Sequence, residues 1–226
     1  MKSLRTVHYS LIAAAVAGAA VVSTPAAAEI SATATVSNVY LWRGLDLGMG
    51  VPGIAGSLDY THSSGLFVGA WGSSAGPGTE TDIYAGYEYS SDDFGFKAAV
   101  YDYTYPYDPD VDFQEAYLNF SASGFFVDGY FGIGKTGPSN AEVDNKNNYF
   151  DLGYTKDKYT LKVGQTNNDL KDTDYTHVDV SYAYNDNLSF TLSGVVDSDD
   201  GAVTAGNQDP LFVVSYSLPL DIEAKK

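Results

Sequence analysis

The most constraining feature of this sequence is the rhythm of its connections. From Ile30 onward, apolar and polar residues alternate with a period of two, and clusters of Gly, Asn, Asp, Ser and Pro interrupt the pattern. That period predicts β-strands rather than helices. We expect twelve strands, at residues 30–42, 53–60, 66–73, 81–89, 94–103, 113–121, 125–134, 148–154, 159–165, 177–184, 188–196 and 211–220.

The segments between these strands are alternately long and short along the whole chain. The short ones are residues 61–65, 90–93, 122–124, 155–158 and 185–187. An even number of strands with tight turns at one end and long loops at the other is typical of outer-membrane barrels. The sequence therefore predicts an all-β fold, a closed up-and-down antiparallel transmembrane β-barrel of twelve strands. In that arrangement the long loops face outside and the C-terminus returns to the periplasm.

The first 28 residues have the composition of a secretory signal peptide. Lys2 and Arg5 precede an apolar run, Leu11–Val22, and Ala26–Ala28 supplies small residues for cleavage. The run is shorter than the roughly 20 residues that a membrane helix needs. We expect residues 1–28 to be a signal peptide and residues 29–226 to form the barrel.

The charge and the cysteine content exclude several classes of protein. The formal net charge is −17, and loss of Lys2 and Arg5 with the signal peptide would make it −19. Nucleic acid is excluded as a partner, because phosphate contacts need clustered Lys and Arg. The chain has no cysteine, which excludes disulfides, thiolate catalysis and Cys-ligated zinc.

The charged residues within the strands share one face. This face is predicted to line the lumen, and it carries seven acids and two bases: Asp59, Asp82, Glu88, Lys97, Glu115, Asp128, Asp151, Lys162 and Asp179. The opposite face is apolar and is expected to meet lipid, although Asp102 lies on it near a strand end. Six tyrosines are predicted to face inward and to narrow the lumen: Tyr84, Tyr101, Tyr103, Tyr117, Tyr130 and Tyr149.

Aromatic residues flank the short turns. They are Tyr60 and Phe67, Tyr89 and Phe94, Phe120 and Phe125, Tyr154 and Tyr159, and Tyr184 and Phe190. A ring of aromatics at one end fits a membrane–water interface, whereas a soluble core would distribute them along the strands. Strand 66–73 remains ambiguous, because one phase carries Leu66 and Val68 while the other carries Phe67 and Trp71.

Several segments resemble the TorF family of proposed porins of Gram-negative bacteria. The resemblance is carried by Tyr40-Leu41-Trp42-Arg43-Gly44, residues 56–73, residues 80–87, the Tyr-rich segment Tyr101–Tyr107 and Glu115-Ala116-Tyr117. It implies an outer-membrane location and a pore function, and it implies no catalytic residue. Barrels of this kind often finish on an aromatic residue. Here Asp221–Lys226 follows Leu220, which weakens that signal for membrane assembly.

Candidate catalytic and metal motifs are weak. Gly72-Ser73-Ser74-Ala75-Gly76 matches a nucleophile elbow, but another strand follows it instead of a helix. His62 is expected in a short turn and His177 near an outer mouth, both as solvated polar residues. Asp197–Gly201 resembles the start of a calcium loop but lacks the Gly and Glu that an EF-hand needs. We expect no catalytic, cofactor or metal site, and at most weak divalent-cation binding at loop acids such as Asp108, Asp110 and Asp112.

Three functions remain open from the sequence. The first is a narrow outer-membrane porin for small solutes or ions, with an acidic lumen that would favour cations and with outer-membrane lipid around it. The second is a non-conducting structural or adhesive barrel whose own side chains block the lumen. The third is a soluble periplasmic β-barrel binding protein. The chain is not expected to be an enzyme.

Overall fold

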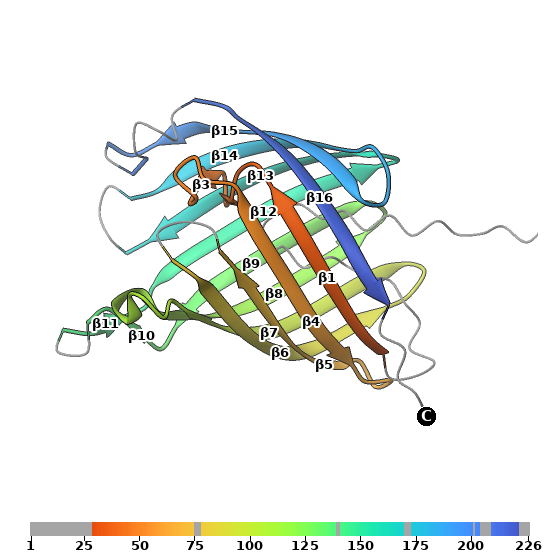
Figure 1. Ribbon diagram of the computed structural model, residues 1–226, viewed down its shortest axis with the longest axis horizontal. Helices are drawn as coiled ribbons and strands as arrows, with labels where there is room; N and C mark the ends of the chain where they lie inside the picture. The colour runs from red at the N-terminus through yellow and green to blue at the C-terminus, as the bar shows by residue number, and fades with distance from the viewer. Residues whose placement is uncertain are drawn as a thin grey trace, which may run out of the picture.

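Twelve strands close into a single antiparallel barrel in the computed structural model (Figure 1). The structure describes residues 29–74, 78–138, 141–169, 173–200, 202–203 and 209–221. The predicted signal peptide, residues 1–28, lies outside the described residues, as does the end of the chain from residue 222. The barrel strands are β1 (Glu29–Ser37), β4 (Gly53–Thr61), β5 (Leu66–Ser73), β6 (Glu80–Ser90), β7 (Phe94–Thr104), β8 (Phe113–Ala122), β9 (Phe125–Ile133), β12 (Asn147–Lys156), β13 (Tyr159–Asn168), β14 (Tyr175–Ala183), β15 (Leu188–Ser198) and β16 (Leu211–Asp221).

Each barrel strand pairs with the next barrel strand along the chain, and β1 closes the cylinder. β1 pairs with β4 on one side, where Ile30 faces Tyr60. It pairs with β16 on the other, where Ala34 faces Leu218. Closure leaves no unpaired strand edge among the described barrel strands, which is what a sheet surrounded by lipid requires.

The two ends of the barrel differ as the sequence predicts. Tight turns such as residues 123–124 and 157–158 join the strands at one end, where Glu29 and Asp221 also lie. We call this the short-turn end. The opposite, long-loop end carries the longer connections, including residues 38–52 and 134–146. The predicted fold class and strand order are therefore confirmed.

Two long loops contain short hairpins of their own. The first strand was expected to run to Trp42, but β1 ends at Ser37, and β2 (Leu41–Trp42) pairs with β3 (Leu45–Asp46). A second hairpin joins β10 (Lys135–Thr136) to β11 (Val143–Asp144), and a 3-10 turn, η1, spans Pro109–Val111. The expected 30–42 strand was wrong because alternation continues through the hairpin, whose strands leave the barrel ladder.

Several strands extend farther toward the long-loop end than their apolar pattern indicates. β12 and β13 pair as far as Asn147 with Asn168, beyond the apolar stretch of either strand. Backbone pairing needs no apolar side chain, so the ladder continues past the apolar band.

The outward face is apolar around the whole barrel. Large side chains on it are exposed, among them Ile54, Leu58, Ile83, Val100, Leu118, Val127, Leu152, Leu161, Val180, Leu192 and Phe212. Asp102, the one charge expected on this face, accepts a hydrogen bond from Gln114 Nε2 at 2.9 Å. A lipocalin-like interior would require the apolar face to point inward, and the structure shows the opposite arrangement.

Aromatic side chains form part of a band near the short-turn end. Phe94 stacks on Phe120 with 5.9 Å between ring centroids, and Phe125 packs on Tyr154 at 4.5 Å. Phe67 was expected in this band but is buried inside the barrel. The phase of β5 explains the error, because Leu66 and Val68 point outward and Phe67 and Trp71 point inward. No helix among the described residues is long and apolar enough to cross a membrane.

Candidate functional site: the barrel interior

The nine predicted lumen-lining residues point into the barrel. The residues next to them on each strand point outward, as Phe150 and Leu152 do on either side of Asp151. Five of the nine are buried: Asp82, Glu115, Asp128, Asp151 and Asp179. Asp59, Glu88, Lys97 and Lys162 are partly exposed to the interior.

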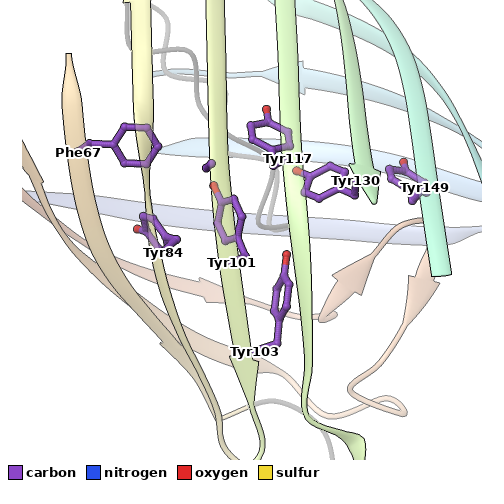
Figure 2. Close-up of a cluster of buried hydrophobic side chains, with 8 residues drawn as sticks. Phe67, Tyr84, Tyr101, Tyr103, Tyr117, Tyr130 and Tyr149 are labelled. Carbon is purple, nitrogen blue, oxygen red and sulfur yellow. The ribbon is translucent and has the colours of Figure 1, made fainter. Parts of the chain in front are cut away.

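One wall of the interior is a ladder of aromatic rings. Figure 2 shows Phe67 and six tyrosines, which project from adjacent strands β5 to β12: Tyr84, Tyr101, Tyr103, Tyr117, Tyr130 and Tyr149. Neighbouring rings contact one another, with centroids 5.0 Å apart for Tyr84 and Tyr101 and 4.6 Å apart for Tyr117 and Tyr130. The ring of Tyr84 lies over Gly69, where a Cβ would come within 2.3 Å of it. We call this surface the aromatic wall.

The facing wall carries small hydroxyl side chains. Strands β14, β15, β16, β1 and β4 turn serines and threonines inward, and these pair across the strands. The pairs are Ser181 with Thr191 at 2.8 Å, Thr35 with Ser217 at 2.6 Å and Thr33 with Ser57 at 2.9 Å. We call this surface the hydroxyl wall. Because its side chains are short, they reach less far into the interior than the tyrosines opposite them.

The β2–β3 hairpin reaches across to the aromatic wall. At its tip, Arg43 donates from Nη1 and Nη2 to the two carboxylate oxygens of Glu115, at 3.0 and 2.6 Å. The guanidinium also lies 4.5–4.7 Å from the ring centroids of Trp42, Tyr130 and Tyr149. Burial disfavours the guanidinium cation, but Glu115 outweighs this effect and holds the pKa of Arg43 above its ordinary value. Arg43 is therefore a largely buried cation with a carboxylate and three rings around it.

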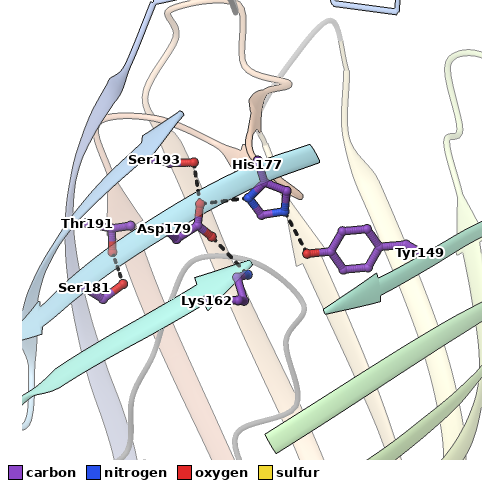
Figure 3. Close-up of polar contacts among 7 residues, drawn as sticks. All are labelled: Tyr149, Lys162, His177, Asp179, Ser181, Thr191 and Ser193. Carbon is purple, nitrogen blue, oxygen red and sulfur yellow. Dashed lines mark hydrogen bonds and ion pairs between the residues drawn. The ribbon is translucent and has the colours of Figure 1, made fainter. Parts of the chain in front are cut away.

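A polar cluster on β14 supports the hairpin from the other side. Figure 3 shows His177 between Tyr149 and Asp179, with Nε2 2.8 Å from the Tyr149 hydroxyl and Nδ1 2.9 Å from Asp179 Oδ1. Asp179 also accepts a hydrogen bond from Ser193 at 2.6 Å and pairs with Lys162 Nζ at 3.1 Å. His177 was expected to be solvated, and the structure shows it fully buried. The prediction was wrong because β14 begins at Tyr175, which places His177 inside the strand ladder.

This cluster is not arranged for nucleophilic catalysis. The hydroxyl of Ser193 donates to Asp179 rather than to the imidazole of His177, whereas a nucleophile must be hydrogen-bonded to its base. Ser74, the centre of the G-x-S-x-G match, is exposed just beyond the end of β5, and Ala75 and Gly76 lie outside the described residues. His62 lies in a short turn as expected and contacts Ser64 at 2.8 Å.

The interior is more open toward the short-turn end than toward the long-loop end. Near the short turns, the side chains of Glu88 and Lys97 keep 26% and 17% of their surface exposed and form an ion pair at 3.8 Å. Near the long loops, the side chain of Glu115 is only 1% exposed. Tyr103 and His177 are fully buried at this level as well. The hairpin thus packs against the interior in the half of the barrel that adjoins the long loops.

Two buried polar groups near the hairpin have no hydrogen-bond partner among the described residues. Both carboxylate oxygens of Asp82 and the hydroxyl of Tyr103 are unsatisfied, and the two residues face each other across β6 and β7. Tyr103 also packs edge-on against Trp42, with centroids 5.7 Å apart. Buried polar groups normally have partners, so these two mark a place where a further molecule would be stabilised.

Sequence reasoning missed two interior contributors. Glu80 is buried and accepts a hydrogen bond from the Tyr40 hydroxyl at 2.7 Å, but the expected strand began one residue later. Arg43 falls in a connection between two expected strands, yet the structure places its side chain inside the barrel. A lone Arg-Gly pair flanked by Trp42 and Leu45 is the only sequence signal for its hairpin. Among the described residues, no group of three or more His, Cys, Asp or Glu side chains is placed to hold a metal ion.

Comparison with known proteins supports the fold. A profile of the family described as "Bacterial protein of unknown function (Gcw_chp)" matches residues 21–213. The comparison with curated proteins finds no match. Three similar solved structures are the KdgM porin (11% identity, 86% of this chain and 99% of that chain, TM-score 0.48), the NanC porin (9%, 87% and 100%, 0.45) and a structure from work on the in-meso crystallization of membrane proteins (14%, 85% and 85%, 0.53). At 14% identity, the last of these bears on the fold alone.

Proposed function

This chain belongs to the Gcw_chp family of bacterial proteins of unknown function, and we propose that it is a narrow channel of the outer membrane for small solutes or cations. The observation that carries the proposal is the inverted distribution of side chains. Large apolar groups cover the outside, and most charged side chains of the barrel strands point inside. Soluble proteins rarely expose apolar surface on this scale.

The dimensions of the strands agree with a bilayer. Most barrel strands hold 9–11 residues, which is the length that a tilted transmembrane strand needs. The aromatic band near the short turns would lie at one membrane interface. By analogy with other outer-membrane barrels, the short turns would face the periplasm and the long loops the exterior.

The interior favours a hydrophilic path beside the hydroxyl wall. Its short Ser and Thr side chains leave more of the cross-section free than the tyrosines opposite. The proposed lumen-lining residues are those predicted from the sequence, together with Glu80 and Arg43. Acids outnumber bases in this set, so we propose that the lumen concentrates cations.

The remaining expectations form part of the same proposal. A signal peptide at residues 1–28 would direct export, and the TorF resemblance agrees with a pore. The KdgM porin has been studied in complex with disordered oligogalacturonate. Because uronates are anions, the acidic interior described above would disfavour such a solute in this chain. We propose no enzymatic role, because the Ser193 hydroxyl donates to Asp179 and not to the imidazole of His177, as an activated nucleophile would.

A non-conducting barrel is the second candidate, and the burial near the long loops favours it. Arg43, Glu115 and Tyr103 leave little exposed surface at that level. If the β2–β3 hairpin never moves, the barrel would have a structural or adhesive role.

Single-channel recording in planar bilayers tests the proposal. The refolded barrel should give discrete conductance steps in potassium chloride, smaller than those of wider porins. Heat-modifiable migration on SDS gels should first show that the sample is folded. Folded protein that gives no steps would favour the non-conducting barrel. Recovery of the natural protein from the soluble periplasmic fraction would contradict both membrane functions.

A further inference from the structure

The tip of the β2–β3 hairpin keeps a conformation that its sequence does not favour. Trp42 pairs with Leu45, and the two residues between them, Arg43 and Gly44, have φ of +48° and +87°. Such a two-residue turn prefers Asn, Asp or Gly at both central positions. An arginine with positive φ is disfavoured in its backbone, so its side chain must provide a compensating interaction.

The groups that surround the Arg43 side chain form a recognition site for a planar cation. Glu115 binds the two Nη atoms of Arg43 in the bidentate geometry that suits a guanidinium. The rings of Tyr130 and Tyr149 lie within cation–π distance, at 4.7 Å each. Three of these four contacts come from the barrel wall and only the ring of Trp42 comes from the hairpin itself.

The wall part of the site is held in place without the hairpin. Tyr149 is fixed by its hydrogen bond to His177, and Tyr130 packs between Tyr117 and Tyr149 with centroids 4.6 and 5.9 Å away. Glu115 lies on β8, within a strand paired on both sides. Removal of Arg43 would therefore leave a preformed carboxylate and two rings.

We propose that this place is a binding site for solutes that carry a guanidinium group, and that Arg43 occupies it as a tethered stand-in. The inference rests on the proposed channel function for its biological meaning, because such a solute would enter from the long-loop side. Only one side chain of the hairpin, that of Arg43, occupies the site. The hairpin itself is small, because β2 and β3 hold two residues each. A solute that displaces Arg43 would break the ion pair between the hairpin and Glu115, which leaves the packing of Trp42 on Tyr103 as the contact with the aromatic wall.

Unsatisfied groups beside the hairpin extend the site. Asp82 is fully buried and neither of its carboxylate oxygens has a hydrogen-bond partner among the described residues, and its neighbour Tyr103 packs against Trp42. An amino group on the same solute would find an acceptor there. The ligand class is thus a small molecule with a guanidinium at one end and a second hydrogen-bond donor at the other.

Tryptophan fluorescence tests the site in the full barrel, in detergent micelles, where no conductance is needed. The chain has only two tryptophans, so a Trp71→Phe background leaves Trp42 as the reporter beside the site. Methylguanidinium chloride should give a saturable change that potassium chloride at equal ionic strength does not. In Arg43→Ala the methylguanidinium concentration at the titration midpoint should fall by about tenfold or more. The reason is that the native Arg43 side chain is a tethered competitor, which acts at millimolar effective concentration.

Two further variants make the result decisive. Glu115→Gln added to Arg43→Ala should abolish the saturable change. Lys146→Ala, which removes an exposed cation paired with Asp169 at 2.9 Å, should titrate like the parent. If Arg43→Ala fails to show heat-modifiable folding, Arg43→Gln replaces it. A folded Arg43 variant without a saturable response, or one that responds equally after Glu115→Gln, would overturn the proposal. Saturable binding by a barrel that never conducts would reject the channel function and leave the site intact.

Discussion

The imidazole of His177 lies directly against the backbone of Gly44. A Cβ on Gly44 would come within 2.5 Å of both Cβ and Cγ of His177. Since His177 is fully buried on β14 and bonded to Tyr149 and Asp179, it cannot easily move away. The contact fixes how deeply the β2–β3 hairpin enters the barrel.

Gly44→Ala should therefore push the hairpin out of the interior. The expected result is a larger or longer-lived single-channel current and a shift of Trp42 fluorescence. Gly50→Ala is the matched control, because Gly50 also has positive φ, +84°, but a methyl group added there would meet no described atom within 4 Å. Both changes cost about 1–3 kcal/mol of backbone strain. Equal currents in the two variants would show that the contact with His177 does not limit the hairpin.

The second prediction tests which face meets lipid. Leu118 and Val180 point outward and are 46% and 49% exposed. Leu118→Arg and Val180→Arg should each make insertion less favourable by about 2–4 kcal/mol, the cost of a charge near the bilayer midplane of a barrel. The measurement is the folded fraction in lipid vesicles, read from heat-modifiable migration.

Thr160→Arg is the control for that experiment. Thr160 points inward and faces Ser181, the strand neighbour of Val180. The Thr160→Arg variant should lose much less of its folded fraction in vesicles, because an arginine at this position remains in a polar interior. If all three variants insert equally well, the assignment of the two faces is wrong.

The faces and strand order could be predicted because both follow from the backbone alone. A strand alternates its side chains with a period of two, so the charges of β6 and β8 fix which phase points inward. Turn length then fixes the neighbours of each strand. These two rules place Asp82, Glu115 and Asp179 inside without any knowledge of packing.

The hairpin could not be predicted because loop side chains follow no such period. Nothing local to Trp42 and Arg43 indicates that they fold inward onto β8, β9 and β12. That arrangement depends on Glu115, 72 residues away in the sequence. Phe67 shows the same limit on a smaller scale, since nearness to a turn placed it in the aromatic band while its phase placed it inside.

The third prediction concerns the ion pair between Lys162 and Asp179. Asp179 also bonds to His177 and Ser193, so its carboxylate has other donors besides the Lys162 ammonium. Asp179→Ala should cost about 3–5 kcal/mol of unfolding free energy, because it removes the carboxylate that neutralises a largely buried cation. Lys162→Met should cost less, since two donors still stabilise the carboxylate of Asp179. Urea unfolding in lipid vesicles measures the unfolding free energy of both variants. The double variant should lose less unfolding free energy than the sum of the two single losses. Equal losses from the two single variants would contradict this account.

The last prediction is that an open barrel prefers cations. Three interior bases are each matched to one acid: Arg43 to Glu115, Lys97 to Glu88, and Lys162 to Asp179. Two of the other acids are held by neutral donors instead. Asp59 accepts from Tyr84, and Asp128 accepts from Tyr117 and Asn119 at 2.6 and 2.9 Å. Carboxylates without a matched cation attract cations and repel anions, and the low-dielectric wall concentrates their field along the axis.

The test is the reversal potential in a potassium chloride gradient. The native barrel should show cation selectivity, and Asp59→Asn combined with Asp128→Asn should reduce it while keeping the tyrosine contacts. Glu115→Gln should shift the selectivity toward anions through a different route, because it leaves the charge of Arg43 unmatched. A native preference for anions, or an unchanged reversal potential after both Asp59 and Asp128 are neutralised, would exclude the acidic wall as the selectivity element. An effect of Glu115→Gln alone would instead assign selectivity to the level of the hairpin, where the interior is most buried.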